Sequence, residues 1–377
     1  ASIYKELTAN DVTSTKTLLH EAIPLTGTIV SGTYSDENIK NYAHDMFQSV
    51  YDYPYLSSSA NHIFDITFGY SNDSTMSGTT SGHIQNSKKI NIYNQMAQVL
   101  VGYDQTGSVK QFDQDGDFFG TTTDKMKECI FIDFSRLLVK DEIKKGSFQI
   151  ELGVSGGVPG GYGFSQGSHI MDHRLLLSDT SGSTSYFVNS PVGEYGILSV
   201  TASTIAGNYE PMNANMYKPV GLLYYQAGVA VISASVFASS SGGIINPFNI
   251  QGLQEEPIMT KALQDIDMML TGSSISASAD ALRNRIYNIQ FNNTVELNST
   301  IYFCRANHNE FNYSANPTYL SGSQINVKVE ADDTPVAYVT TVGMYSADNQ
   351  LLAVGKLSEP LRKDPSTELT LRARLDY

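Results

Sequence analysis

The last fifth of the chain alternates apolar and polar residues almost to its final position. Residues 338–345 and 351–357 are rich in Val, Leu and Tyr, and residues 369–377 place Leu or Ala at every second position before the final Tyr. This two-residue period is typical of β-strands with one protected face. We therefore expect the end of the chain to be built into a sheet and to be ordered, unlike a frayed terminus.

Helical spacing of apolar residues is confined to three other segments. Residues 36–50, 86–101 and 257–270 repeat apolar side chains every three or four positions, and Ser35 is placed to cap the first of them. Residues 220–238 are interpreted as two strands around a Gln-Ala-Gly turn. The sequence therefore predicts an α+β, mainly β fold, with antiparallel sheets or sandwich-like domains and a few amphipathic helices.

The length of 377 residues is enough for two or three domains. Two Gly-rich breaks, the first over residues 153–167 and the second at residues 239–243, suggest where they divide. We predict an N-terminal α+β domain at 1–152, a Gly-rich loop with a β-rich middle region at 153–243, and a C-terminal domain at 244–377. In the last of these a helix precedes antiparallel strands. No repeat or heptad pattern is present, which favours a compact subunit over a long fibre.

The charge balance argues against nucleic acid as a partner. The formal net charge is −14, and the densest basic group, Lys140, Lys144 and Lys145, is interrupted by Asp141 and Glu142. Phosphate binding requires clustered Lys and Arg. Charged residues make up 16% of the chain, below the usual value of about 25%, and 23 Tyr are present. Such neutral, Tyr-rich surfaces suit protein–protein contacts, although they also occur in ordinary β proteins.

The sequence indicates neither a disulfide nor a membrane segment. Cys129 and Cys304 both lie in apolar runs and are expected to be buried free thiols. Residues 220–238 approach the length of a membrane span but contain Gln226 and several small polar residues, so strands are the better interpretation. The N-terminus has no signal-peptide core, and we expect a cytoplasmic product whose initiator Met has been removed before Ala1.

One short motif resembles the nucleophile elbow of serine hydrolases. Residues 163–167 read Gly-Phe-Ser-Gln-Gly, which places Ser165 at the nucleophile position, with Asp172 close behind and His308 as a later His. The elbow requires a hydrophobic strand before the Ser and a helix after it. The residues before the motif are Gly-rich and form no strand, so we interpret it as a loop that matches by chance.

Two further groups carry the residue types of metal sites. His169 and His173 are four positions apart, a spacing that binds one metal only on a helix, whereas the Leu-rich segment after them predicts a strand. Asp113, Asp115 and Asp117 alternate as in a calcium-binding EF-hand loop. That loop requires Gly at its sixth position, where this chain has Phe118, and Asp124 stands at the twelfth. A solvated loop is the plain interpretation, and a structural calcium ion remains open.

Several segments resemble a family of virion structural proteins of marine contractile-tailed cyanophages. The resemblance is carried by residues 310–319, 340–345, 351–354 and 372–377, and by residues 91–97, 132–138 and 140–146. It covers most of the chain, but none of these motifs has a chemical role. What it implies is therefore a place in a virion assembled in the host cytoplasm.

On this basis we expect a structural subunit of a tailed bacteriophage virion, in the tail or baseplate, that acts through protein–protein contacts. The expected partners are other virion proteins and copies of the same chain, with no nucleic acid and no membrane. We expect no enzymatic activity, no catalytic residue, no cofactor and no metal-binding residue. A neck or capsid-decorating protein, and a receptor- or glycan-binding adhesin, remain the alternatives.

Overall fold

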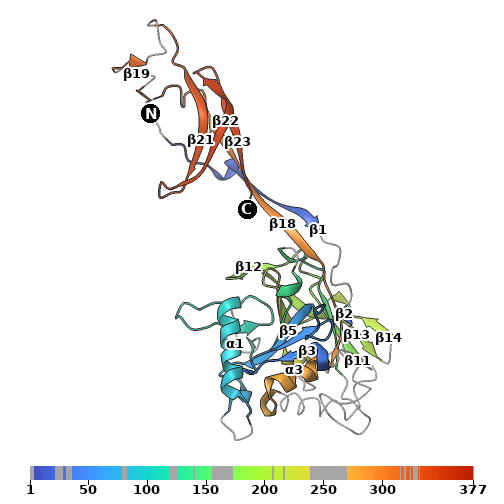
Figure 1. Ribbon diagram of the computed structural model, residues 1–377. Coiled ribbons are helices and arrows are strands. Elements are labelled where there is room, and N and C mark those ends of the chain that lie inside the picture. Colours follow the sequence, from blue (N-terminus) through green and yellow to red (C-terminus); the bar gives the residue numbers. More distant parts are fainter. Residues whose placement is uncertain are drawn as a thin grey trace. The chain divides into compact units, whose positions relative to one another are not determined.

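The computed structural model forms two compact units (Figure 1). Unit 1 comprises residues 1–19 and 296–377, and unit 2 comprises residues 20–295. The residues that the structure describes are 4–21, 29–30, 36–78, 83–118, 125–138, 141–154, 173–205, 208–214, 217–237, 270–314, 316–317, 320–322, 324–325, 330 and 332–376.

The predicted division at residues 152 and 243 is wrong, because strand pairing joins distant parts of the chain. β10 (Gln149–Gly153) and β11 (His173–Ser178) pair across the first predicted boundary. The predicted C-terminal domain is itself split between the two units, since its first part belongs to unit 2. In unit 1, the N-terminal strand and the C-terminal strand flank one long strand of the same sheet.

Unit 2 is built on one large antiparallel sheet. Its strands, in spatial order, are β2 (Ile29–Val30), β17 (Ile286–Gln290), β10, β11, β13 (Gly193–Ile205), β15 (Lys218–Tyr224), β16 (Val229–Ser233), β8 (Glu128–Asp133), β5 (His62–Tyr70), β4 (Gln48–Tyr51) and β3 (Ile39–Asn41). β12 (Phe187–Ser190) and β14 (Asn208–Pro211) also pair with β13. This architecture confirms the predicted α+β, mainly β class, and the two strands expected over residues 220–238 are β15 and β16.

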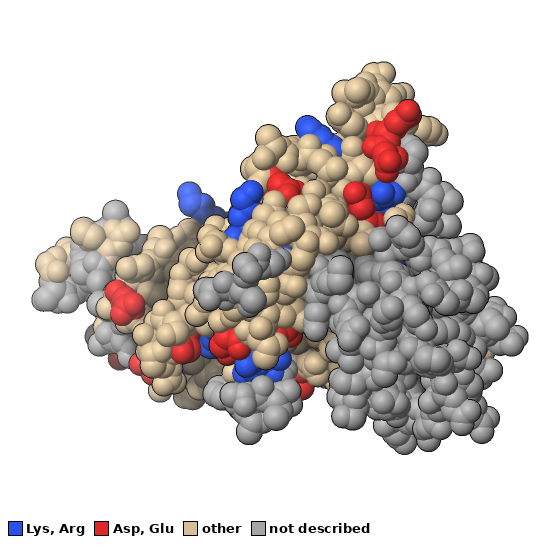
Figure 2. All heavy atoms as spheres, turned by 90° about the horizontal axis from the view of Figure 1, so that it is seen from below, with Lys and Arg blue, Asp and Glu red and all other residues tan. Residues whose placement is uncertain are grey.

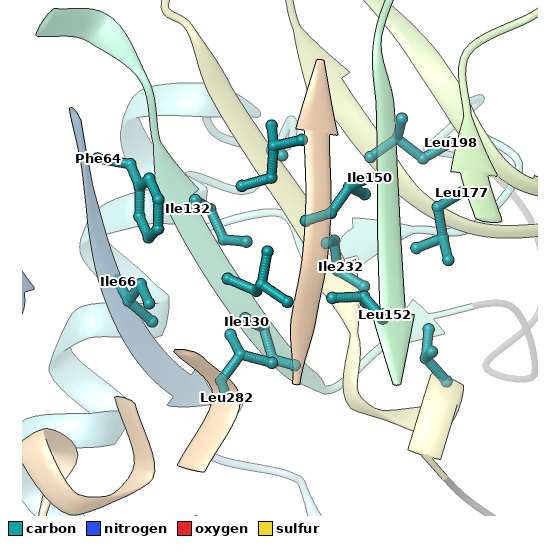
Figure 3. Close-up of a cluster of buried hydrophobic side chains, with 14 of the residues drawn as sticks. Phe64, Ile66, Ile130, Ile132, Ile150, Leu152, Leu177, Leu198, Ile232 and Leu282 are labelled. Atoms are coloured by element: carbon teal, nitrogen blue, oxygen red, sulfur yellow. The ribbon is translucent and has the colours of Figure 1, made fainter. Parts of the chain in front are cut away.

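The central strands of this sheet are buried on both faces. In β8, Ile130 and Ile132 join one hydrophobic cluster, whereas Cys129 and Phe131 join another. The first cluster also receives residues from β10, β11 and β17, so distant parts of the sheet enclose a common core with β5 and β8 (Figure 3). The sheet is therefore folded over its own core, with the second cluster on its outer side.

Helix α1 (Asn86–Leu100) covers the second cluster and confirms the helix predicted at 86–101. Its buried residues follow the helical period: Lys89, Ile92, Tyr93, Ala97 and Leu100. Helix α3 (Ile275–Arg283) was not predicted. Its Ser274 cap accepts the N–H of Ala277 at 3.2 Å. Residues 257–269 of the third predicted helix lie outside the described residues.

The helix predicted over residues 36–50 is wrong, because this segment forms the β3–β4 hairpin. Ile39 lies directly opposite Val50, and both are buried against the core beside β5. The loop between the strands is held by ring contacts of Tyr42 with His44, at 5.1 Å between ring centres, and with Phe47, at 4.8 Å. Pairing with β5 outweighs the helical pattern, which over so few residues does not separate a helix from a hairpin.

Short elements complete unit 2. β6 (Phe112–Asp113) pairs with β7 (Lys125–Met126), and β9 (Glu142–Ile143) pairs with Asn293 and Thr294. The described 3₁₀ turns of the whole chain are η1 (Ala9–Asp11), η2 (Asp36–Asn38), η3 (Thr75–Ser77), η4 (Ser135–Leu137) and η6 (Ala234–Phe237).

Unit 1 consists of strands and hairpins. Its strands β1 (Val12–Glu21), β18 (Asn293–Ala306) and β23 (Leu369–Asp376) follow that order in a four-stranded sheet. The fourth strand is β9, which pairs with the first two residues of β18. Two separate hairpins are formed by β21 (Ala337–Tyr345) with β22 (Leu351–Lys363), and by β19 (Leu320–Ser321) with β20 (Gln324–Ile325). The predicted C-terminal strands are confirmed up to Asp376, whereas Tyr377 lies outside the described residues.

A buried carboxylate in unit 2 predicts a dependence of stability on pH. Asp179 is buried and accepts the backbone N–H groups of Gly146 at 2.8 Å and Phe148 at 2.9 Å. Burial nevertheless raises its pKa from 3.8 to about 6. Between pH 4 and 6 the folded chain therefore holds a proton that the unfolded chain has released. As pH rises through this window, we expect Asp179 to lower the free energy of unfolding by roughly 2–3 kcal/mol in total.

The test compares the wild-type chain with Asp179→Asn, which cannot titrate at this position. Urea unfolding followed by near-ultraviolet circular dichroism from pH 4.5 to 7.5 gives the free energy of unfolding at each pH. The wild-type curve should fall relative to that of the variant up to about pH 6 and then run parallel to it. Parallel curves over the whole range would refute the assignment.

Candidate functional site

The described part of unit 1 buries almost no apolar side chain. Among its described residues, Ala337 is the single buried apolar residue. Both hydrophobic clusters consist of unit 2 residues, from Ile39 to Phe291 in the first and from Ile92 to Ile275 in the second. Ordering the backbone of a residue costs roughly 1–2 kcal/mol, which a folded domain recovers mainly by apolar burial. The described part of unit 1 lacks that source of stability.

The β21–β22 hairpin carries apolar residues on both faces. On one face Tyr345 lies opposite Leu351, and Gly343 lies opposite Val354. Large side chains are exposed along this hairpin by the following fractions: Tyr338 47%, Tyr345 49%, Leu351 54%, Leu352 65% and Val354 54%. The other face carries Val339, Val342 and Met344, which are only half-buried. We call Tyr338, Tyr345, Leu351, Leu352 and Val354 the hairpin patch.

Unit 1 also presents unpaired strand edges. β23 is an outer strand of its sheet, and β21 and β22 pair only with each other among the described strands. An isolated two-stranded hairpin is marginal in water, and free edges accept strands from other chains. Leu369, Leu371 and Leu375 on β23 are half-buried, whereas Arg372 and Arg374 on its opposite face are exposed. These features are typical of a surface that another chain covers.

Polar contacts fix the base of the hairpin in place of apolar packing. Lys363 is fully buried, and its Nζ donates to Asn312 Oδ1 at 2.6 Å and to the Asp364 carbonyl oxygen at 2.8 Å. Asp364 Oδ1 accepts the hydroxyl groups of Ser366 and Thr367 at 2.6 and 2.7 Å. These hydrogen bonds lower the pKa of Asp364 to about 2. The network joins the end of β22 to the loop after β18 that contains Asn312.

The nucleophile-elbow and histidine motifs fall mainly outside the described residues. Ser165 and the rest of residues 163–167 lie there, as do His169 and Asp172. His173 is the first residue of β11, which confirms the strand predicted directly after the His pair. His308 lies in unit 1, exposed, with its Nδ1 at 3.3 Å from Glu368 Oε1.

The acidic loop at residues 113–117 is more organised than its sequence shows. Oxygen atoms of Asp113, Asp115 and Asp117 lie within 4.8 Å of one another. Asp115 and Asp117 are exposed, but the Asp113 side chain is fully buried, with its Oδ2 at 2.5 Å from Lys125 Nζ. Burial raises the pKa of Asp113, although the bond to Lys125 opposes the effect. Asp124 lies outside the described residues.

Sequence patterns did not identify the partners of this loop. Lys125 reaches Asp113 because β6 and β7 pair across twelve positions. The buried Tyr195 hydroxyl, from β13, donates to the Gly116 carbonyl oxygen at 2.8 Å. A hairpin pairing and a contact across 79 positions leave no periodic signal in the sequence.

The two cysteines form no disulfide and differ in their burial. Cys129 and Cys304 are free thiols, as predicted, but only Cys129 is buried, while Cys304 is half-buried. Figure 2 shows acidic and basic side chains scattered over a largely uncharged face. Of the described helices, none has the length and hydrophobicity required to cross a bilayer.

Comparison with known proteins finds no matching family model, no matching curated protein and no matching solved structure.

Proposed function

We propose that this chain is a structural subunit of a tailed bacteriophage virion, in the tail or baseplate, and that unit 1 attaches it to neighbouring copies or virion proteins. The observation that carries this proposal is the absence of an apolar core from the described part of unit 1. Strands such as those described in unit 1, which fold without a buried apolar core, gain their stability from a surface outside the subunit. The sequence resemblance to cyanophage virion proteins supports the setting.

The chemistry of the hairpin patch favours a protein as its partner. Tyr338 and Tyr345 each combine a large ring with one polar group, and such side chains are enriched in protein–protein interfaces. Aliphatic residues Leu351, Leu352 and Val354 lie beside them. The edges of β21 and β23 that pair with no other described strand add backbone groups with which a strand of a neighbour can pair.

The first test replaces two residues of the hairpin patch with lysine. Leu351→Lys and Val354→Lys together place two charges on one face of the hairpin. We expect the purified wild-type chain to self-associate and the double variant to weaken that association at least about tenfold. Sedimentation velocity over a range of concentrations measures both.

The matched control places the same charges on exposed apolar residues of unit 2. Leu56 is 85% exposed and Val99 is 57% exposed, and Leu56→Lys with Val99→Lys should leave association unchanged. A wild-type chain that stays monomeric while the amides of β21 and β22 resist hydrogen exchange would contradict the proposal, because unit 1 would then be stable alone. Electron microscopy of an intact particle with antibody against this chain tests its position in the virion.

A further inference from the structure

We propose that Asp113, Asp115 and Asp117 form a binding site for one calcium ion. Their carboxylate oxygens lie within 4.8 Å of one another, close enough to coordinate the same cation. A calcium ion takes six to eight oxygen ligands at about 2.3–2.6 Å, and carboxylates spaced at alternate positions of a turn supply several of them. Backbone carbonyl groups and water complete such a shell.

A buried oxygen atom of Asp113 is the observation that distinguishes this loop from an ordinary acidic turn. The side chain is 0% exposed, and Oδ2 is paired with Lys125. Oδ1 is also buried and has no hydrogen-bond partner. Buried carboxylate oxygens are almost always satisfied, because losing water without a replacement is costly. A cation held between the three carboxylates supplies the missing partner.

The local charge favours a cation. The three carboxylates carry a formal charge of −3, which exceeds the +1 of the Lys125 ammonium group beside Asp113. All the donor atoms are oxygens, which excludes a zinc site of the usual nitrogen and sulfur type. Magnesium binds few carboxylates and keeps most of its water, so three converging side chains favour calcium.

The backbone conformation of Phe118 is compatible with a calcium-binding loop, although the sequence lacks Gly at this position. Phe118 stands where EF-hand loops carry Gly, yet its φ of 58° is the left-handed conformation that Gly provides there. Its ring packs at 5.4 Å from that of Tyr195, whose hydroxyl group donates to the Gly116 carbonyl oxygen. Packing against β13 therefore holds Phe118 in a conformation that sequence rules assign to Gly.

The test titrates the full chain, first stripped with EGTA, with calcium chloride in a calorimeter. We expect saturable binding of about one ion per chain. At a hundredfold excess over the dissociation constant, the melting temperature of unit 2 should rise by roughly 5–10 °C. Terbium, which replaces calcium, should luminesce on excitation of tyrosine because Tyr195 contacts the loop.

Asp115→Asn is the main variant, because Asp115 is exposed and its replacement leaves the buried Asp113–Lys125 pair intact. It should weaken calcium binding at least about tenfold and remove most of the thermal shift. Asp104→Asn is the matched control, since Asp104 also accepts backbone N–H groups in an exposed turn. It should bind calcium like the wild-type chain. No binding by the wild-type chain, equal binding by Asp115→Asn, or equally tight binding of magnesium would each overturn the calcium site.

Discussion

Replacing Lys145 with methionine is expected to lower the free energy of unfolding of unit 2 by about 3–5 kcal/mol. Lys145 Nζ lies 2.7 Å from Glu142 Oε1 and 2.7 Å from Glu194 Oε2. The side chains of Lys145 and Glu142 are only 5% and 4% exposed. Burial alone lowers the pKa of Lys145, but its bonds to the two glutamates outweigh this effect and raise it. Methionine fills a similar volume and leaves two carboxylates without their shared ammonium group.

A second substitution separates charge from packing. In the double variant Lys145→Met with Glu142→Gln, one of the two charges is removed, so about 1 kcal/mol or more of the loss should be recovered. Lys127→Met is the control, because Lys127 lies 3.4 Å from Asp73 in a partly exposed pair and should cost less than about 1 kcal/mol. Urea unfolding measures all three. A loss below 1 kcal/mol for Lys145→Met alone would show that the buried network does not stabilise unit 2.

Replacing Gly69 with alanine is expected to cost about 3 kcal/mol or more. Gly69 lies in β5 directly beneath α1. A Cβ atom there would stand 2.7 Å from the Tyr93 nitrogen and 2.8 Å from the Lys89 carbonyl oxygen. Both are backbone atoms, so relief requires the helix and the strand to separate.

The helix cannot shift easily, because both side chains beside Gly69 are anchored. The Tyr93 hydroxyl donates to the Met126 carbonyl oxygen at 2.8 Å. Lys89 Nζ donates to the carbonyl oxygens of Leu270 and Ser273 at 2.6 and 2.7 Å. Moving α1 outward would weaken all three hydrogen bonds.

Gly272→Ala is the control for this prediction, since a Cβ at Gly272 would meet nothing within 4 Å. Its melting temperature should stay within a few degrees of that of the wild-type chain, whereas Gly69→Ala should melt well below it. Differential scanning calorimetry of the three chains gives the comparison. Equal melting temperatures for Gly69→Ala and the wild-type chain would mean that the strand–helix contact is loose.

The sequence patterns correctly predicted the elements in which the periodically spaced apolar residues are also the residues buried in the structure. Helix α1 repeats its apolar residues every three or four positions and buries that same face. β23 alternates Leu or Ala with polar residues, and its burial alternates in the same way. Residues 36–50 fit a helical period equally well, but Ile39 and Val50 gain more by pairing next to β5. A period over so few residues cannot decide between these outcomes.

For the candidate sites too, the sequence gives the spacing of the residues, whereas their burial and their partners are known only from the structure. The alternation of Asp113, Asp115 and Asp117 is visible in the sequence, and it identifies the loop as a candidate cation site. That Asp113 is buried, with one oxygen atom unpaired, depends on β6, β7 and Tyr195. The exposure of Leu351, Leu352 and Val354 is equally invisible in a strand pattern, which indicates an apolar face but not what covers it.

The sequence by itself determined the mainly β class, the strands at the C-terminus and the position of α1, because each depends on a local period. Only the tertiary structure decided that β1 and β23 share a sheet with β18, that Gly69 touches α1, and that unit 1 lacks a core in its described part. These properties arise from contacts between residues far apart in the chain. Their free energy depends on which surfaces meet, and no local pattern of side chains records that choice.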